Sequence, residues 1–170
     1  VEYKWEMIAH RLRELAFLNK GLEIGVRDER TDQSETYLFE GGVVEFVSFL
    51  NEGRSSLHPD PIYLEGERDG VGVEIAMQYN DSYQETVFTY ANNIKTVEGG
   101  THLVGFRAAL TATLNAYSTR ENLLKDVKFA LAGEDTREGL TAVVSVNVPE
   151  PQFEGQTKGK LGNSAVRGLV

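Results

Sequence analysis

Several segments of this chain place apolar residues at every second position, which is the spacing of side chains along one face of a β-strand. The pattern runs from Val71 to Tyr79 and again from Leu140 to Val148, and a shorter version covers residues 85–90. Another apolar segment, Ile62–Glu67, precedes the first of these across an Asp69-Gly70 turn, an order that favours a β-hairpin. The chain is therefore expected to build a sheet of about four to five strands.

Segments with helical periodicity lie before and between these strands. Apolar residues recur at intervals of three and four in four segments, at residues 3–20, 43–50, 103–117 and 121–127. Two short strands, at 22–26 and 36–39, lie between the first two of these helices. Because no internal repeat appears and the elements do not alternate regularly, we expect an α+β fold with a mixed β-sheet and helices on one side of it.

The composition fits one globular domain and excludes several chemistries. The 170 residues include 41 % apolar and 25 % charged residues and no cysteine, so disulfides, thiol catalysis and cysteine-based zinc sites are excluded. With 17 basic and 26 acidic residues, the net charge of −9 argues against a domain that holds nucleic acid through its own field. No apolar run approaches the ~20 residues that span a bilayer, so a soluble cytoplasmic protein without a membrane partner is expected.

The segment FEGQTKGKLGN, at 153–163, is basic and glycine-rich within an acidic chain. It does not match a phosphate-binding P-loop, because Gly155 and Gly159 flank three residues rather than four and Leu161 stands where that motif needs Ser or Thr. Gln156 and Lys158 are two positions apart, so an extended backbone would point both side chains the same way. An amide and an ammonium group suit a phosphate ligand, but on the residues alone a solvated loop without a ligand is the simpler interpretation.

Few other residues form a chemical motif. Glu134 and Asp135 offer carboxylates for acid–base work, but a one-turn helix capped by Asp135 is the simpler interpretation. Arg107 lies in an Ala/Thr/Leu helix, where its side chain would reach solvent at the helix edge or need a buried partner. The three histidines lack a second ligand at metal-binding spacing, so no metal site is expected and surface or capping roles are assigned to His10, His58 and His102.

Three long motifs carry a family resemblance, and they occur in order along essentially the whole chain: RLRELAFLNKG (Arg11–Gly21), NNIKTVEGGTHLVGFR (Asn92–Arg107) and EGLTAVVSVNVPEPQFEGQTKGKLGN (Glu138–Asn163). Together they resemble the transducer domain of the B subunit of bacterial DNA gyrase. The B-type subunit of topoisomerase IV shares the pattern and is the near relative.

The resemblance implies a domain plan. It suggests a helix at 1–20 that joins an ATPase domain, an α+β core at 21–152, a phosphate-sensing loop at 153–163 and the start of a C-terminal helix at 164–170. The core is expected to have a ribosomal-protein-like fold with a left-handed βαβ crossover. Both ends of the chain then correspond to junctions with neighbouring domains, one of them a metal-binding nucleolytic domain.

The resemblance also implies a function. Gln156 and Lys158 would reach the terminal phosphate of ATP in the neighbouring ATPase domain, and Lys158 would stabilise charge on the transferring phosphate. This contact would couple ATP binding and hydrolysis to gate closure, DNA strand passage and negative supercoiling by a type IIA topoisomerase, an isomerase. Mg²⁺ would bind elsewhere in the full protein, this chain alone would not turn over ATP, and Arg107 would face the DNA cavity.

The implied partners are the other domains of the subunit, the gyrase A subunit, a second B subunit in an A2B2 assembly, and double-stranded DNA in the bacterial nucleoid. Three alternatives stay open. The same role could belong to topoisomerase IV, or the chain could be an acidic interaction module whose basic tail docks a partner. A small-molecule enzyme could instead use Glu134 and Asp135 near His102, and this requires a pocket that joins them.

Overall fold

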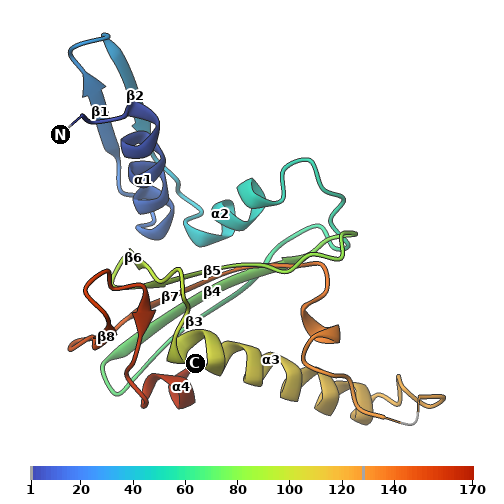
Figure 1. The fold of residues 1–170 in the computed structure, drawn as a ribbon. Helices are drawn as coiled ribbons and strands as arrows, with labels where there is room; N and C mark the ends of the chain where they lie inside the picture. Colours follow the sequence, from blue (N-terminus) through green and yellow to red (C-terminus); the bar gives the residue numbers. More distant parts are fainter. Residues whose placement is uncertain (1, 128) are drawn as a thin grey trace.

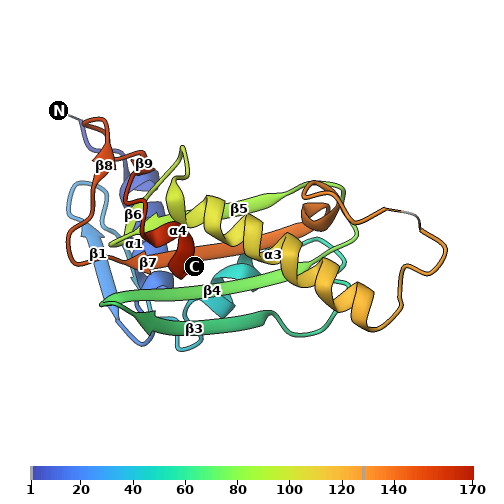
Figure 2. The same ribbon diagram turned by 90° about the horizontal axis from the view of Figure 1, so that it is seen from below.

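A computed structural model of the chain describes residues 2–127 and 129–170. At its centre lies a five-stranded mixed sheet with the strand order β3-β4-β7-β5-β6 (Figures 1 and 2). The neighbouring strands are antiparallel except for β5 and β7, which are parallel. The strands of this sheet are β3 (Ile62–Arg68), β4 (Val71–Tyr79), β5 (Thr86–Ala91), β6 (Ile94–Lys95) and β7 (Leu140–Asn147). The predicted hairpin and the predicted mixed α+β fold are therefore confirmed.

Helices cover both faces of the sheet, so the expectation of helices on one side was wrong. One face carries α1 (Trp5–Leu18) and α2 (Val43–Leu50), and the other carries α3 (Thr101–Arg120) and the short α4 (Val166–Leu169) (Figure 1). The central strand β7 explains this arrangement, because every residue from Leu140 to Val146 is buried. Val143 packs with the α2 side and Val144 with the α3 side.

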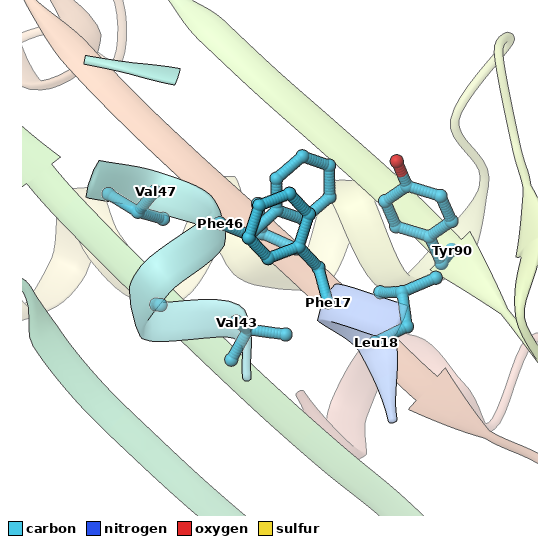
Figure 3. Packing of buried hydrophobic residues seen from close by; sticks show 8 residues of the cluster. Phe17, Leu18, Val43, Phe46, Val47 and Tyr90 are labelled. Carbon is cyan, nitrogen blue, oxygen red and sulfur yellow. The ribbon is translucent and has the colours of Figure 1, made fainter. Parts of the chain in front are cut away.

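An aromatic cluster holds α1 and α2 onto the sheet (Figure 3). The ring of Phe17 from α1 stacks on Phe46 from α2 with a centroid distance of 4.6 Å, and on Phe39 with a distance of 3.7 Å. Phe46 in turn lies against the rings of Phe88 and Tyr90 on β5. Ring pairs such as Phe17 and Phe46 add to the stabilisation that burial of the rings already provides.

A buried carboxylate strengthens the junction between α1 and the sheet. Glu14 of α1 is only 4 % exposed, and it accepts a hydrogen bond from the hydroxyl of Tyr90. Lys95 Nζ lies 3.5 Å and Arg11 Nη1 3.8 Å from its oxygens, so the buried negative charge has cationic partners. Burial and the carboxylate raise the pKa of Tyr90, which therefore keeps its proton as the donor.

The connection from β5 to β7 runs over the sheet through α3. In Figure 2 both strands run from right to left, α3 lies in front of the sheet, and β7 lies below β5. This geometry is a left-handed crossover, an exception to the usual right-handed connection between parallel strands. The expected left-handed βαβ unit is confirmed.

Two further hairpins stand outside the central sheet. β1 (Ile24–Asp28) pairs with β2 (Gln33–Tyr37) beside α1, so the second strand begins earlier than the predicted 36–39. β8 (Phe153–Glu154) pairs with β9 (Lys160–Leu161), a hairpin that the sequence patterns did not predict. No helix within the described ranges is both long and apolar enough to cross a membrane.

The segment after α3 differs from its prediction. Residues 121–126 form turns instead of the expected short helix, because α3 itself continues to Arg120 and Asn122 adopts a positive φ that ends the helix. The prediction of a one-turn helix near Glu134 is confirmed as a 3-10 turn, η1 (Asp135–Arg137). Asp135 does not cap it, since its carboxylate accepts the Ala132 N–H at 2.8 Å.

Candidate functional site

The loop singled out in the sequence forms the tip of the β8–β9 hairpin. Gln156 and Lys158 are both exposed there, between the two short strands. The backbone is a turn, with positive φ at Gly155 (79°) and Lys158 (55°). The prediction of an extended segment with both side chains on one face was therefore wrong, because the two-residue strands leave only residues 155–159 to reverse the chain.

The two lysines of this hairpin have different surroundings. Lys160 Nζ lies 2.9 Å from Glu154 Oε2, and this hydrogen bond and its charge raise the pKa of Lys160. Lys158 has no carboxylate partner within the part of the chain that the structure describes, and its Nζ lies 5.8 Å from the centre of the Phe153 ring. The tip thus carries one cation that is not neutralised by a neighbouring acid, together with an amide that can donate hydrogen bonds.

The base of the hairpin is fixed to the body of the protein. The Glu98 N–H donates to the Gly159 carbonyl at 2.9 Å, and the Leu161 N–H donates to the Gly99 carbonyl at 3.1 Å. Leu161 is fully buried. Across the hairpin, just beyond the two strands, the Gly162 N–H donates to the Gln152 carbonyl at 2.7 Å. The loop is therefore a turn held out from an ordered base rather than a flexible tail.

Asn163 closes the hairpin instead of capping the last helix. Its side chain accepts the Gln152 N–H at 2.6 Å and donates to the Glu150 carbonyl at 3.0 Å. The family resemblance suggested the start of a helix at 164–170, and α4 does form there, but it begins at Val166 without a side-chain cap. α4 lies tightly against α3, since a Cβ on Gly105 would meet the Arg167 carbonyl oxygen at 2.4 Å.

Arg107 forms an ion pair on the surface of α3. Its Nη2 lies 2.7 Å and its Nε 3.0 Å from Glu85 Oε1, and Arg137 reaches the other oxygen of Glu85 at 3.2 Å. The Arg107 side chain remains 39 % exposed, which agrees with a side chain at the helix edge. A role toward DNA stays a prediction.

Two of the three histidines, His58 and His102, have structural roles in this fold. His58 accepts the Tyr79 N–H at 3.0 Å through Nε2, and its Nδ1 lies 2.8 Å from the Asp60 carbonyl. His102 is fully buried, so its assignment as a surface or capping residue was wrong, and burial lowers its pKa to about 4. Among the described residues, no three side chains of His, Cys, Asp or Glu are arranged to hold a metal ion.

The small-molecule enzyme hypothesis fails on geometry. Glu134 and Asp135 line an open depression beside Glu85 and Arg137, and His102 does not reach it. His102 is enclosed at the beginning of α3, whereas η1 contacts the helix further along, where Thr111 Oγ1 lies 3.1 Å from Thr136 Oγ1. The pocket that this hypothesis requires is absent from the described part of the chain.

Comparison with known proteins places these features in a family. The chain matches the family described as DNA gyrase B over residues 42–170. It is 57 % identical over 170 residues to the gyrase B protein of Myxococcus xanthus, covering 100 % of this chain and 21 % of that protein. The gyrase B protein of Haloferax lucentense is also 57 % identical, with 99 % of this chain and 27 % of the relative covered. The chain thus spans about a fifth to a quarter of the length of these relatives.

Solved structures give the same result for the fold. The ATPase domain of Thermus thermophilus gyrase B superposes with a TM-score of 0.87 at 38 % identity, covering 100 % of this chain and 46 % of that one. The ATP-binding domain of Francisella tularensis topoisomerase IV has a TM-score of 0.80 over 99 % of this chain and 45 % of that one, and at 24 % identity it supports the fold alone. The matches define a class, the B-type subunits of type IIA DNA topoisomerases. Within this class the chain belongs to the DNA gyrase B family.

Proposed function

We propose that this chain is the transducer domain of a DNA gyrase B protein and that the hairpin tip senses the terminal phosphate of ATP. The single observation that carries the proposal is the position of Lys158, exposed at the tip of an anchored hairpin without an acidic partner among the described residues. The hydrogen bonds at the base of the loop favour a functional tip over a solvated loop without a ligand. The domain plan of a joining helix at 1–20, a core at 21–152 and a loop at 153–163 belongs to the same proposal.

The residues at the tip fit a nucleotide phosphate. Lys158 supplies a compact positive charge, and the Gln156 amide supplies a neutral donor that can address a second oxygen. The body of the protein is acidic, with a net charge of −9, so an anion would be attracted to this local basic spot and not to the surface as a whole. The similarity to the Thermus thermophilus ATPase domain supports ATP as the source of the phosphate.

The proposed mechanism depends on differential binding. ATP bound by a neighbouring ATPase domain would supply a terminal phosphate for Lys158 to contact, and ADP lacks that phosphate. A charge-assisted hydrogen bond is worth roughly 1.5–3 kcal/mol, which corresponds to about ten- to a hundred-fold in an equilibrium constant. This is enough to favour one orientation of the transducer over another without locking it.

The consequences at the level of the assembly follow from this orientation. With ATP present, Lys158 holds the transducer in one position. After the phosphate leaves, the loop loses its contact and the domain can rotate. In a gyrase assembly with a second B subunit, two A subunits and DNA, this rotation would couple ATP turnover to gate closure and strand passage. Mg²⁺ and the DNA-cleaving groups belong to other parts of the protein in this proposal.

The test compares the two lysines of one hairpin. In the complete subunit, Lys158→Ala is expected to lower ATPase turnover by about ten- to a hundred-fold, because the phosphate loses a charged donor. Lys160→Ala is the matched control, because that lysine is paired with Glu154 and does not lie at the tip. Equal turnover in both variants, close to the wild type, would remove the phosphate role of Lys158.

A further inference from the structure

A buried polar chain connects the base of the Lys158 loop to the beginning of α3. Thr96, His102 and Thr89 are each at most 4 % exposed. His102 Nε2 lies 2.9 Å from Thr96 Oγ1, and Thr96 Oγ1 lies 2.7 Å from Thr89 Oγ1. The two threonines also exchange hydrogen bonds with each other's backbone, from each hydroxyl to the partner's carbonyl at 3.0 Å.

The protons of this chain can be assigned by counting donors. The Thr89 hydroxyl donates to the Thr96 carbonyl, and the Thr96 hydroxyl donates to the Thr89 carbonyl or to Thr89 Oγ1, which lies 2.7 Å away. A proton on His102 Nδ1 would have no acceptor among the described residues, so the imidazole carries its proton on Nε2 and donates it to Thr96 Oγ1. This assignment satisfies every donor and leaves His102 Nδ1, which has no partner among the described residues, as a bare acceptor.

Thr96 stands at the start of the turn that holds the loop. The Gly99 N–H donates to the Thr96 carbonyl at 2.9 Å, which closes the turn over residues 96–99. The same turn supplies both hydrogen bonds to the loop base, from Glu98 N–H to the Gly159 carbonyl and from Leu161 N–H to the Gly99 carbonyl. Gly159 is the residue directly after Lys158. The position of Lys158 therefore depends on a turn whose buried end is bonded to His102.

We propose that His102 is a positioning residue for Lys158, which donates its Nε2 proton to Thr96 and so fixes the turn on which the base of the loop is held. His102 does not touch the nucleotide in this role. Because His102 is the second residue of α3, it also ties the loop to that helix, so α3 and the loop move together. The inference rests on the proposed phosphate role of Lys158, and it adds that the turn over residues 96–99 sets the position of that lysine.

The test removes the hydrogen bond from either side in the complete subunit. Thr96→Val keeps the shape of the side chain but loses the hydroxyl, whereas Thr96→Ser keeps the hydroxyl. His102→Leu loses the donor, whereas His102→Gln places an amide N–H near the position of Nε2. We expect Thr96→Val and His102→Leu to lower ATPase kcat about five- to tenfold, roughly the effect of one lost neutral hydrogen bond, and the Ser and Gln variants to restore most of it.

A double-mutant cycle with Lys158→Ala separates positioning from general damage. If His102 acts through Lys158, Thr96→Val has no further effect on kcat in the Lys158→Ala subunit. An effect of the same size in both backgrounds would overturn the proposal, and so would kcat values for Thr96→Val equal to those for Thr96→Ser. If His102→Leu does not fold, the Thr96 pair decides alone. A normal turnover of Lys158→Ala itself would instead contradict the phosphate role, which is a separate result.

Discussion

The tip and the base of the β8–β9 hairpin are a few residues apart and differ in almost every physical property. At the tip, Gln156 and Lys158 are exposed and make no side-chain hydrogen bond within residues 2–127 and 129–170. At the base, Leu161 and His102 are fully enclosed, and Gly100 lies against the Leu161 backbone. The base therefore contributes to the stability of the fold, while the tip remains available to an external ligand.

This contrast suggests that stability and the proposed phosphate sensing can be separated by mutation. A side chain without partners in the fold can be changed at little cost in the free energy of unfolding. A change at a side chain or backbone position with close neighbours lowers the free energy of unfolding, because the interior is close-packed. Substitutions at the base should therefore lower stability, and substitutions at the tip should lower only function.

The largest effect is expected at Gly100. Its φ is 137°, and a Cβ there would lie 2.4 Å from the oxygen and 2.5 Å from the nitrogen of Leu161. Gly100→Ala should lower the free energy of unfolding by about 3 kcal/mol or more, through the clash and the backbone strain together. Gly66→Ala is the matched control, since a Cβ at Gly66 meets nothing within 4 Å. Urea denaturation of both variants measures the difference, and equal stabilities would show that the base is not close-packed.

A smaller effect is expected from acid at His102. Its pKa in the fold is about 4 because of burial, below the ordinary value of 6.5. Because the folded protein binds this proton less readily than the unfolded chain, the free energy of unfolding is highest above pH 6.5 and falls as the pH is lowered toward 4. The total loss is about 3 kcal/mol, at 1.36 kcal/mol per pH unit. Unfolding measured at pH 7 and pH 4.5 should show a steeper loss for the wild type than for His102→Gln, which cannot titrate. Parallel losses in the two proteins would contradict the neutral buried imidazole.

The smallest effect is expected at the tip. Gln156→Ala and Lys158→Ala remove exposed side chains without a hydrogen-bond partner in the described part of the chain, so their unfolding midpoints in urea should match that of the wild type. A loss that approached the loss for Gly100→Ala would mean that the tip is part of the folded core, and the separation between tip and base would fail.

Much of the fold could be predicted from periodicity, because long strands and helices repeat their signal. β4, β7 and α3 all lie where their patterns placed them. The second covered face of the sheet was missed because Thr141 and Ser145 are polar, and polar residues at alternate positions indicate a solvent-exposed face. In the fold both are buried, and Thr141 donates to Asn51 at 2.7 Å. The side chains that make the burial of Thr141 favourable, Asn51 and Asn80, are 90 and 61 residues away in sequence.

The geometry around the candidate site could be predicted only in part, for a similar reason. Gln156 and Lys158 were identified by their residue types, but the hairpin has two-residue strands, which are too short to produce a periodic pattern. His102 was missed because its one polar partner, Thr96, lies in the turn before α3 and not on the same helix. The apolar positions of α3 predicted its buried face, and nothing in their spacing indicated a buried imidazole beside them.

The most direct test of the phosphate-sensing role compares nucleotides that differ in the terminal phosphate. The complete subunit and its Lys158→Ala variant are titrated with a non-hydrolysable ATP analogue and with ADP, and the dissociation constants are measured by calorimetry. If Lys158 contacts the terminal phosphate, the variant should bind the analogue about ten- to a hundred-fold more weakly and bind ADP as tightly as the wild type. An unchanged ratio of the two affinities would contradict the role of the hairpin tip as a phosphate sensor.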